Sequence, residues 1–177
     1  DKNMDIYLSN SRAGRLADKR IRIFREENPR YLSDVMDLVF TNEKIENPNA
    51  ITFTVHGYND SYKFKTNDER LDEYFDHDRS HWTKEAIEKI AAEEKELWEA
   101  YMCGDVFGIA CERWNAAERE WTAIENTLYE VYGAKDAIAN AKDILLRHST
   151  EAFVVTCEED VKYCFDIKKD GCDDKNV

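Results

Sequence analysis

Residues 67–101 read NDERLDEYFDHDRSHWTKEAIEKIAAEEKELWEAY, and this stretch decides how the rest of the chain is interpreted. It holds twelve acidic and five basic residues, a net charge of −7 out of −13 for the whole chain. Residues 66–69 (TNDE) have the form of a helix-capping box, and Thr83 is a suitable cap for a second helix running to Gly104. The stretch therefore predicts two acidic helices with carboxylates at helical spacing.

The composition is that of a folded protein with acidic surfaces. Hydrophobic residues make up 42% and aromatic residues 12% of the chain, which supplies a core despite 36% charged residues. The 177 residues fit one domain, or two small lobes that share a core. Because DNA, RNA and anionic lipid need a basic footprint, the net charge argues against binding any of them directly. It favours a basic protein partner.

Cysteine content and hydropathy bear on the cellular compartment. The five cysteines are an odd number without a CxxC pair, so neither a disulfide framework nor a zinc knuckle is indicated. We expect a reduced, cytoplasmic protein in which Cys103 and Cys111 behave as small apolar residues. We expect neither a membrane span nor a secretory signal, since the apolar runs are short.

The N-terminal part of the chain alternates in the manner of strands. Residues 4–8 and 20–24 suit half-buried strands, and residues 51–55 and 62–64 suit a β-hairpin. Between them, Asn28-Pro29 is a typical helix start, and apolar residues recur at helical spacing to about residue 41. This pattern predicts a β-β-α-β-β lobe over residues 1–65.

Residues 107–131 carry the most regular apolar pattern, with alternating spacings of three and four. The repeating positions are Phe107, Ala110, Trp114, Ala117, Trp121, Ile124, Leu128 and Val131. This pattern predicts a long helix that packs against residues 83–104 as an antiparallel helical hairpin joined near Gly104. Trp98, Trp114 and Trp121 are expected in the apolar seam, and Trp82 on the surface.

The remaining sequence completes an expected α+β fold. It consists of a small antiparallel sheet lobe, a central antiparallel helical hairpin with additional helices, and a C-terminal β-hairpin. A third helix is expected over residues 134–148, and strands over 152–156 and 161–167. The predicted divisions are the lobe at 1–65, an acidic helical region at 66–149, the C-terminal β-hairpin at 150–168 and a tail at 169–177.

Catalytic motifs are weak in this sequence. It contains no G-x-S-x-G elbow and no phosphate-binding glycine loop, so we expect no catalytic residue and no cofactor. His77 and His81 lie four apart with Asp78 between them, a pattern resembling the zinc-binding H-E-x-x-H. Polar surroundings favour solvated histidines over a bound metal, and a metal-dependent hydrolase is the third alternative for function.

The acidic helices are the main candidate site. Residues four apart on a helix lie about 5–6 Å apart, whereas duplex DNA presents one charge per about 1.7 Å of axis. Several acidic helices side by side can approach the charge density of a duplex and compete with nucleic acid for a basic groove. The common alternative is a solvated acidic face that only aids solubility. The candidate residues are Asp68, Asp72, Asp76, Glu85, Glu88, Glu93, Glu96 and Glu99.

Residues 1–30 form a basic island with a net charge of +3. The candidate arginines in this island are Arg12, Arg15, Arg20, Arg22 and Arg25. They are candidates for a second contact, to a guide RNA or an acidic patch. The favoured alternative is intramolecular neutralisation of the acidic region.

Three short motifs follow one another near the start of the chain: IYLSN at 6–10, GRL at 14–16 and VHGYND at 55–60. In order and rough spacing they resemble the opening of the ArdA antirestriction proteins, which have an I-Y-x-A-N strand, a G-x-L turn and an I-H-D-Y-E-like strand end. The chain departs from that pattern at Ser9 in place of Ala, at Gly57 in place of Asp, in a shorter turn after Asn10, and in the basic charge of its N-terminal island. The resemblance implies an acidic, dimeric DNA mimic from a phage or mobile element that blocks type I restriction–modification enzymes.

These observations lead to one expected function and one main alternative. The expected function is inhibition of a host defence enzyme, either a Cas nuclease (anti-CRISPR) or a restriction enzyme (antirestriction), in the host cytoplasm. The protein is expected to be non-catalytic, to bind no DNA directly, and to be compatible with a homodimer. The alternative is a structural or interaction protein that assembles through its tryptophan-bearing helix.

Overall fold

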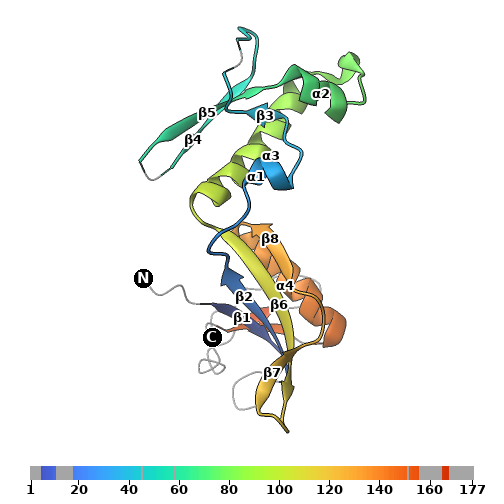
Figure 1. The fold of residues 1–177 in the computed structure, drawn as a ribbon. Helices are drawn as coiled ribbons and strands as arrows, with labels where there is room; N and C mark the ends of the chain where they lie inside the picture. The colour runs from blue at the N-terminus through green and yellow to red at the C-terminus, as the bar shows by residue number, and fades with distance from the viewer. Residues whose placement is uncertain are drawn as a thin grey trace. The chain divides into compact units, whose positions relative to one another are not determined.

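The computed structural model in Figure 1 describes residues 5–10, 18–44, 46–57, 59–150, 152–155 and 165–167. Helices and antiparallel sheets occur together, so the predicted α+β class is confirmed. The chain divides into two compact units, the terminal unit (Asp1–Pro29 with Val106–Val177) and the inserted unit (Arg30–Asp105). Among the described residues, no helix is both long and apolar enough to pass through a membrane.

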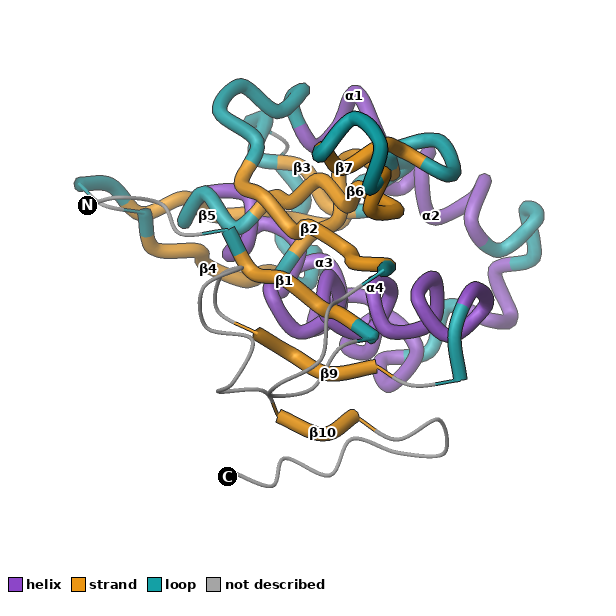
Figure 2. The backbone as a smooth tube through the Cα atoms, turned by 90° about the horizontal axis from the view of Figure 1, so that it is seen from below, coloured by secondary structure: helices purple, strands orange, loops and turns teal. Residues whose placement is uncertain are grey.

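The terminal unit is built on one seven-stranded antiparallel sheet. Its strands are β1 (Ile6–Ser9), β2 (Lys19–Arg25), β6 (Val106–Asn115), β7 (Glu120–Ala123), β8 (Leu128–Tyr132), β9 (Ala152–Val155) and β10 (Phe165–Ile167). They lie in the order β10-β9-β1-β2-β6-β7, and β8 also pairs with β6. Figure 2 shows β9 beside β1, with β10 beyond it. Helix α4 (Ala134–His148) packs against β1, β2 and β6.

Alternation along β2 explains which face of this sheet is covered. Ile21 and Ile23 are almost fully buried in a core cluster that includes Ala141 and Leu145 of α4. Because successive strand residues point to opposite faces, Arg20 and Arg22 lie on the other face. The core of the terminal unit therefore forms between one face of the sheet and α4.

Strand β6 organises the terminal unit. It pairs with β2 along one edge, while its other edge is shared by β8 near Val106 and by β7 near Trp114. A register irregularity separates Phe107 from Ile109. Gly108 lies there directly against Phe24, since a Cβ atom at this position would be 2.3 Å from the ring Cζ. Only glycine fits this close approach without a shift of the ring or the strand.

The inserted unit combines a three-stranded sheet with helices. Its elements are α1 (Leu32–Val35), β3 (Phe40–Thr41), β4 (Thr52–His56), β5 (Ser61–Thr66), α2 (Asp68–Tyr74), the 3₁₀ turn η1 (Arg79–His81) and α3 (Lys84–Met102). The antiparallel strands lie in the order β3-β5-β4, and α3 packs against β4. Helix α3 is the longest helix among the described residues.

Aromatic side chains fill the core of the inserted unit. The ring of Phe53 stacks on Phe64 at 5.0 Å between centroids and lies 4.9 Å from Phe40. Phe64 in turn contacts Trp98 of α3 at 4.7 Å. Since such rings bury large apolar areas, this row fixes α3 against the sheet.

The long helix predicted over residues 107–131 is wrong, and with it the central helical hairpin. Those residues form β6, β7 and β8. Six consecutive residues from Val106 to Cys111 are buried, so both faces of β6 are covered. Apolar residues are then required at successive positions, and some of these positions match helical spacing by coincidence. Asn115 then begins a turn by accepting bonds from the backbone N–H groups of Ala117 and Glu118.

The helix predicted from Asn28-Pro29 to about residue 41 is also mostly wrong. Only the four residues of α1 are helical, and Phe40 and Thr41 pair with β5 instead. The apolar spacing in this segment reflects burial of Leu38, Val39 and Phe40 in an extended chain. Tertiary burial therefore overrides the local helical pattern.

The unit boundaries differ from the predicted lobe at residues 1–65. Strands β1 and β2 pair with β6 and β9 in the terminal unit, whereas β4 and β5 belong to the inserted unit. Long-range pairing decides this division, and no local signal near Pro29 marks it. Strand β2 is therefore separated in sequence from its partner β6 by the whole inserted unit.

Several predicted elements are confirmed. They are the strands at β1 and β2, the β4–β5 hairpin, helices α2, α3 and α4, and the β9–β10 hairpin. Trp98 is buried at 2% exposure, as expected. Trp114 is 36% exposed, so its expected place in the core is wrong, and it contacts Trp121 across the β6–β7 pair at 5.4 Å.

Candidate functional site

Side-chain caps fix where the two acidic helices begin. The Oδ1 atom of Asn67 accepts bonds from the backbone N–H groups of Glu69 and Arg70, at 3.0 and 3.2 Å. The cap of α2 is thus Asn67, one residue after the Thr66 that the capping-box pattern indicated. Thr83 caps α3 as predicted, because its Oγ1 accepts from the N–H of Ala86 at 3.2 Å.

Helix α3 presents a row of carboxylates on the side opposite its buried face. Its buried residues are Ile87, Ile90, Glu94 and Trp98. At about 100° per residue, the four exposed glutamates opposite them fall within an arc of about 80°. These residues, hereafter the α3 acidic row, are Glu85, Glu88, Glu96 and Glu99.

The other predicted acidic residues surround this row less regularly. Asp68 and Asp76 are exposed on and just after α2, and Asp72 is half-buried. Glu93 is exposed at the border of the α3 row, where it lines a shallow hollow together with Tyr74 and other residues at the α2–α3 contact. The structure thus brings four of the eight candidates into one row on a single helix.

Three of the eight candidate carboxylates form ion pairs with nearby basic side chains. The Asp72 carboxylate lies 3.3 Å from the Arg79 guanidinium, and Lys84–Glu88 and Lys95–Glu99 form pairs at 3.8 and 3.9 Å. Exposed pairs of this kind contribute up to about 1 kcal/mol and are screened by salt. Their cations reduce the negative charge of the row, so a partner must displace or accommodate the two lysines.

The charge density of α3 alone is lower than that of a duplex. From Glu85 to Glu99 the helix axis rises about 21 Å, a length over which duplex DNA carries about 12 charges. Five exposed glutamates lie along this length, including Glu93. However, the inserted unit as a whole contains 18 acidic and nine basic residues, which gives it −9 of the chain's −13.

Glu94 is the exception on α3, because its carboxylate is buried at 6% exposure. Its two oxygens accept bonds from the backbone N–H groups of Val39 and Phe40, both at 2.9 Å. Desolvation raises the pKa of this carboxyl above its ordinary value, although the two N–H bonds and Arg70 act in the opposite direction. Glu94 therefore ties the chain entering β3 to α3, a role that the sequence pattern did not reveal.

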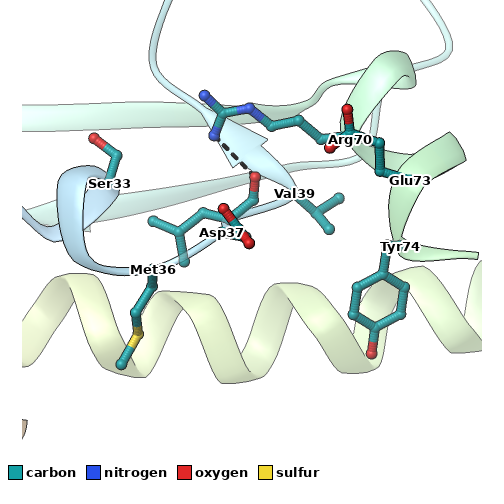
Figure 3. A pocket seen from close by; sticks show the side chains of 8 residues that line it. Ser33, Met36, Asp37, Val39, Arg70, Glu73 and Tyr74 are labelled. Carbon is teal, nitrogen blue, oxygen red and sulfur yellow. Dashed lines mark hydrogen bonds between the residues drawn. The ribbon is translucent and has the colours of Figure 1, made fainter.

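A polar pocket of about 370 Å³ lies next to this segment, between α1, α2 and the chain leading into β3. Figure 3 shows Arg70 reaching over the pocket, where it donates to the carbonyl oxygen of Leu38 at 2.8 Å. The lining also includes Ser33, Asp37 and Glu73. Among the described residues, the lining offers hydrogen-bonding and ionic groups but neither imidazole nor thiol. No motif in the sequence predicts this pocket, since its lining residues come from separate segments of the chain.

The predicted His77–His81 pair does not lie on one helix. Helix α2 ends at Tyr74, and Asp76 and His77 have positive φ values of 52° and 62°. Asp78 caps η1 by accepting bonds from the backbone N–H and hydroxyl of Ser80, and these bonds lower the pKa of Asp78. The two imidazoles therefore lack the placement four residues apart on one helix that a zincin-like metal site requires.

The basic candidates are in part engaged within the terminal unit. Arg20 is buried at 9% exposure, donates to Glu112 at 3.0 Å, and lies over the Trp121 ring at 4.2 Å. Arg22 lies 3.6 Å from Glu112 and 3.8 Å from Asp5. These two carboxylates belong to the terminal unit and not to α2 or α3. Arg12 and Arg15 lie outside the described residues, as do the GRL motif and Tyr58.

The chain matches no protein-family model, no curated protein and no solved structure. The resemblance of its N-terminal motifs to those of ArdA proteins thus stays a prediction.

Proposed function

We propose that the protein inhibits a nucleic-acid-targeting defence enzyme by placing the acidic helices of its inserted unit on that enzyme's basic nucleic-acid-binding surface. The target class is a Cas nuclease or a restriction enzyme, encountered in the host cytoplasm. The inhibitor itself is non-catalytic and needs no cofactor. The observation that carries this proposal is the α3 acidic row, whose carboxylates are exposed on one side of a helix anchored through the other.

Two further observations support the proposal. The inserted unit holds most of the net negative charge in fewer than half of the residues. Only Glu94 of the acidic residues on α3 is buried, so the remaining glutamates are accessible to a partner. Added salt would weaken such binding, because ions screen the attraction between the exposed carboxylates and the basic groove.

The alternative of assembly through a tryptophan-bearing helix loses its stated basis. Trp114 and Trp121 lie on β6 and β7, and no helix spans residues 107–131. Sedimentation of the purified protein would still report whether it forms a stable oligomer. A stable oligomer that binds no nucleic-acid enzyme would favour this alternative.

The main experiment measures binding to a panel of purified restriction enzymes and Cas effectors at increasing salt. We expect one target whose affinity falls steeply with salt and which loses its nucleic acid as the protein binds. The triple substitution Glu93→Lys, Glu96→Lys and Glu99→Lys should weaken this binding at least about tenfold, because it reverses three neighbouring charges.

A matched control distinguishes the effect of charge on α3 from the effect of the protein's total net charge. Glu27→Lys, Glu43→Lys and Asp143→Lys together make the same change in net charge at exposed positions outside α2 and α3. This control should retain most of the affinity at low salt. The proposal fails if binding is indifferent to salt and to the α3 triple, or if both triples weaken binding equally.

A further inference from the structure

Three potential metal-binding side chains from distant parts of the sequence meet in the terminal unit. They are Cys111 on β6, Glu125 in the loop after β7, and His148 at the end of α4. One ligand atom from each lies within 4.8 Å of the other two. Because each member comes from a different element, the cluster is formed by the fold and not by a local motif.

Backbone contacts hold the three elements in place. The N–H of Ile124, the neighbour of Glu125, donates to the carbonyl oxygen of Cys111 at 3.0 Å. The ammonium group of Lys19 on β2 donates to the carbonyl oxygen of His148 at 2.6 Å. The loop and the end of α4 are each fixed to the sheet, so the cluster is preorganised.

The side chains are also connected to one another. The Nε2 atom of His148 lies 2.6 Å from Oε2 of Glu125, and Arg147 donates to the other carboxylate oxygen at 3.0 Å. Glu125 and His148 are about 30% exposed at their side chains (29% and 28%), whereas Cys111 is 2% exposed. The thiol therefore lies below two partly accessible groups at the surface.

A thiol, an imidazole and a carboxylate suggest two kinds of chemistry. In a cysteine hydrolase, the histidine would activate the thiol while the carboxylate orients the imidazole. That role requires an accessible thiol with a lowered pKa. Here burial, assisted by Glu125, raises the pKa of Cys111 to about 11. These properties exclude a nucleophile that is ionised in the absence of a ligand, but a metal ion can replace the thiol proton.

We propose that Cys111, Glu125 and His148 bind one divalent cation of the zinc class through Sγ, a carboxylate oxygen and Nε2. Zinc takes these three ligand types at about 2.0–2.3 Å in a tetrahedral arrangement. The thiol proton passes to solvent as the metal–sulfur bond forms. A water molecule from the exposed side completes the coordination.

The distances required are close to those present. Tetrahedral coordination at those bond lengths places ligand atoms about 3.3–3.6 Å apart. The 2.6 Å contact between His148 and Glu125 must open by about 1 Å or less, and the Cys111 sulfur, within 4.8 Å of both, must approach by up to about 1.2–1.5 Å. We expect side-chain rotations of the two partly exposed residues, Glu125 and His148, to supply this change.

Charged groups of both signs surround the site. Glu112 and Glu125 act on Cys111 together with Arg113 and Arg147. Arg147 is 63% exposed, so solvent screens its repulsion of a cation. Its bond to Oε1 of Glu125 leaves Oε2 facing His148, as expected of a group that orients a ligand.

The test uses the full chain, freed of metal and titrated with Zn²⁺ and Co²⁺. We expect one equivalent to bind, a sulfur-to-cobalt charge-transfer absorption in the near ultraviolet, and a higher melting temperature with Zn²⁺. Cys111→Ser should remove the charge-transfer absorption. Glu125→Gln and His148→Gln, at partly exposed positions, should fold and lower the affinity at least about tenfold.

Two controls test whether other residues bind the metal. Cys103→Ser removes an exposed cysteine at the end of α3 and should leave affinity and absorption unchanged. The triple Cys157→Ser, Cys164→Ser and Cys172→Ser should also leave them unchanged. The proposal is overturned if no stoichiometric metal binds, if the absorption survives in Cys111→Ser, or if either control abolishes it.

Discussion

The two units use their carboxylates in different ways. In the terminal unit, Glu112 is shared by Arg20 and Arg22, and Glu125 by Arg147 and His148. In the inserted unit, most glutamates of α3 face outward, and Glu94 is the buried exception. These two carboxylates connect structural elements of the terminal unit, whereas we expect that most of those on α3 can be changed without disturbing the fold. That availability is what a binding surface requires.

The strongest test of this comparison is Glu94→Ala. It leaves the N–H groups of Val39 and Phe40 without their acceptor and opens a cavity beneath α3. We expect a loss of about 3 kcal/mol in the free energy of unfolding, measured by urea denaturation. Glu96→Ala, nearby on the exposed face of the same helix, should change stability by less than about 0.5 kcal/mol. Equal effects of the two would refute the distinction.

A smaller loss is expected from Glu112→Ala in the terminal unit. The substitution removes the carboxylate shared by Arg20 and Arg22, but Arg20 keeps its contacts with the rings of Trp121 and Tyr7. We expect destabilisation by about 1–2 kcal/mol in the same assay. Glu118→Ala, in the exposed turn between β6 and β7, is the matched control. If Glu112→Ala were as mild as this control, the carboxylate would have no structural role.

The pH dependence of stability should also distinguish Glu94 from the exposed acids. Because its folded pKa is raised, the folded carboxyl keeps its proton at pH values just above 4.5, where the unfolded chain has released it. The contribution of Glu94 to folding stability then falls as pH rises from 4.5 through the folded pKa of Glu94, and it is constant outside that window. The stability difference between the parent protein and Glu94→Ala should therefore be greatest below pH 4.5. A difference that grows with pH would mean that the two N–H bonds outweigh desolvation.

The smallest effects are expected on the α3 acidic row. Glu88→Gln and Glu99→Gln remove the carboxylate charges that pair with Lys84 and Lys95 at 3.8 and 3.9 Å. Each should cost less than about 0.5 kcal/mol, because exposed pairs are well hydrated. Urea denaturation at low and high salt checks this. A loss above about 1 kcal/mol in either variant would show that the row helps to hold the fold.

The parts of the fold that could be predicted from sequence are those fixed by local signals. Thr83 begins α3 by capping it, alternation marks β1 and β2, and helical spacing identifies α4. The strands at 106–132 could not be identified from periodicity, because Val106–Cys111 is buried on both faces of β6. The pairing of β2 with β6 could not be predicted either, since it joins segments that lie on either side of the whole inserted unit.

The same distinction applies to the sites. The exposed glutamates of α3 follow from helical spacing alone, and that spacing also places Glu94 at the centre of the buried face. The spacing of Glu94 relative to Ile87, Ile90 and Trp98 therefore predicts that its side chain is buried. No sequence signal brings together Cys111, Glu125 and His148, because their proximity depends on the sheet and on the end of α4.

The insertion of one unit into the other has a practical consequence. The two points of the terminal unit between which residues 30–105 are inserted lie next to each other. Arg25 pairs with Phe107, and the N–H of Glu26 donates to the carbonyl oxygen of Val106 at 2.9 Å. A hairpin loop of about 2–5 residues can bridge such positions. We therefore expect the inserted unit to behave as a removable cassette. We expect the whole inserted unit, with the aromatic core that holds α3 against its sheet, to fold when grafted into a β-hairpin of an unrelated host, and the remaining chain to fold when closed by a designed turn.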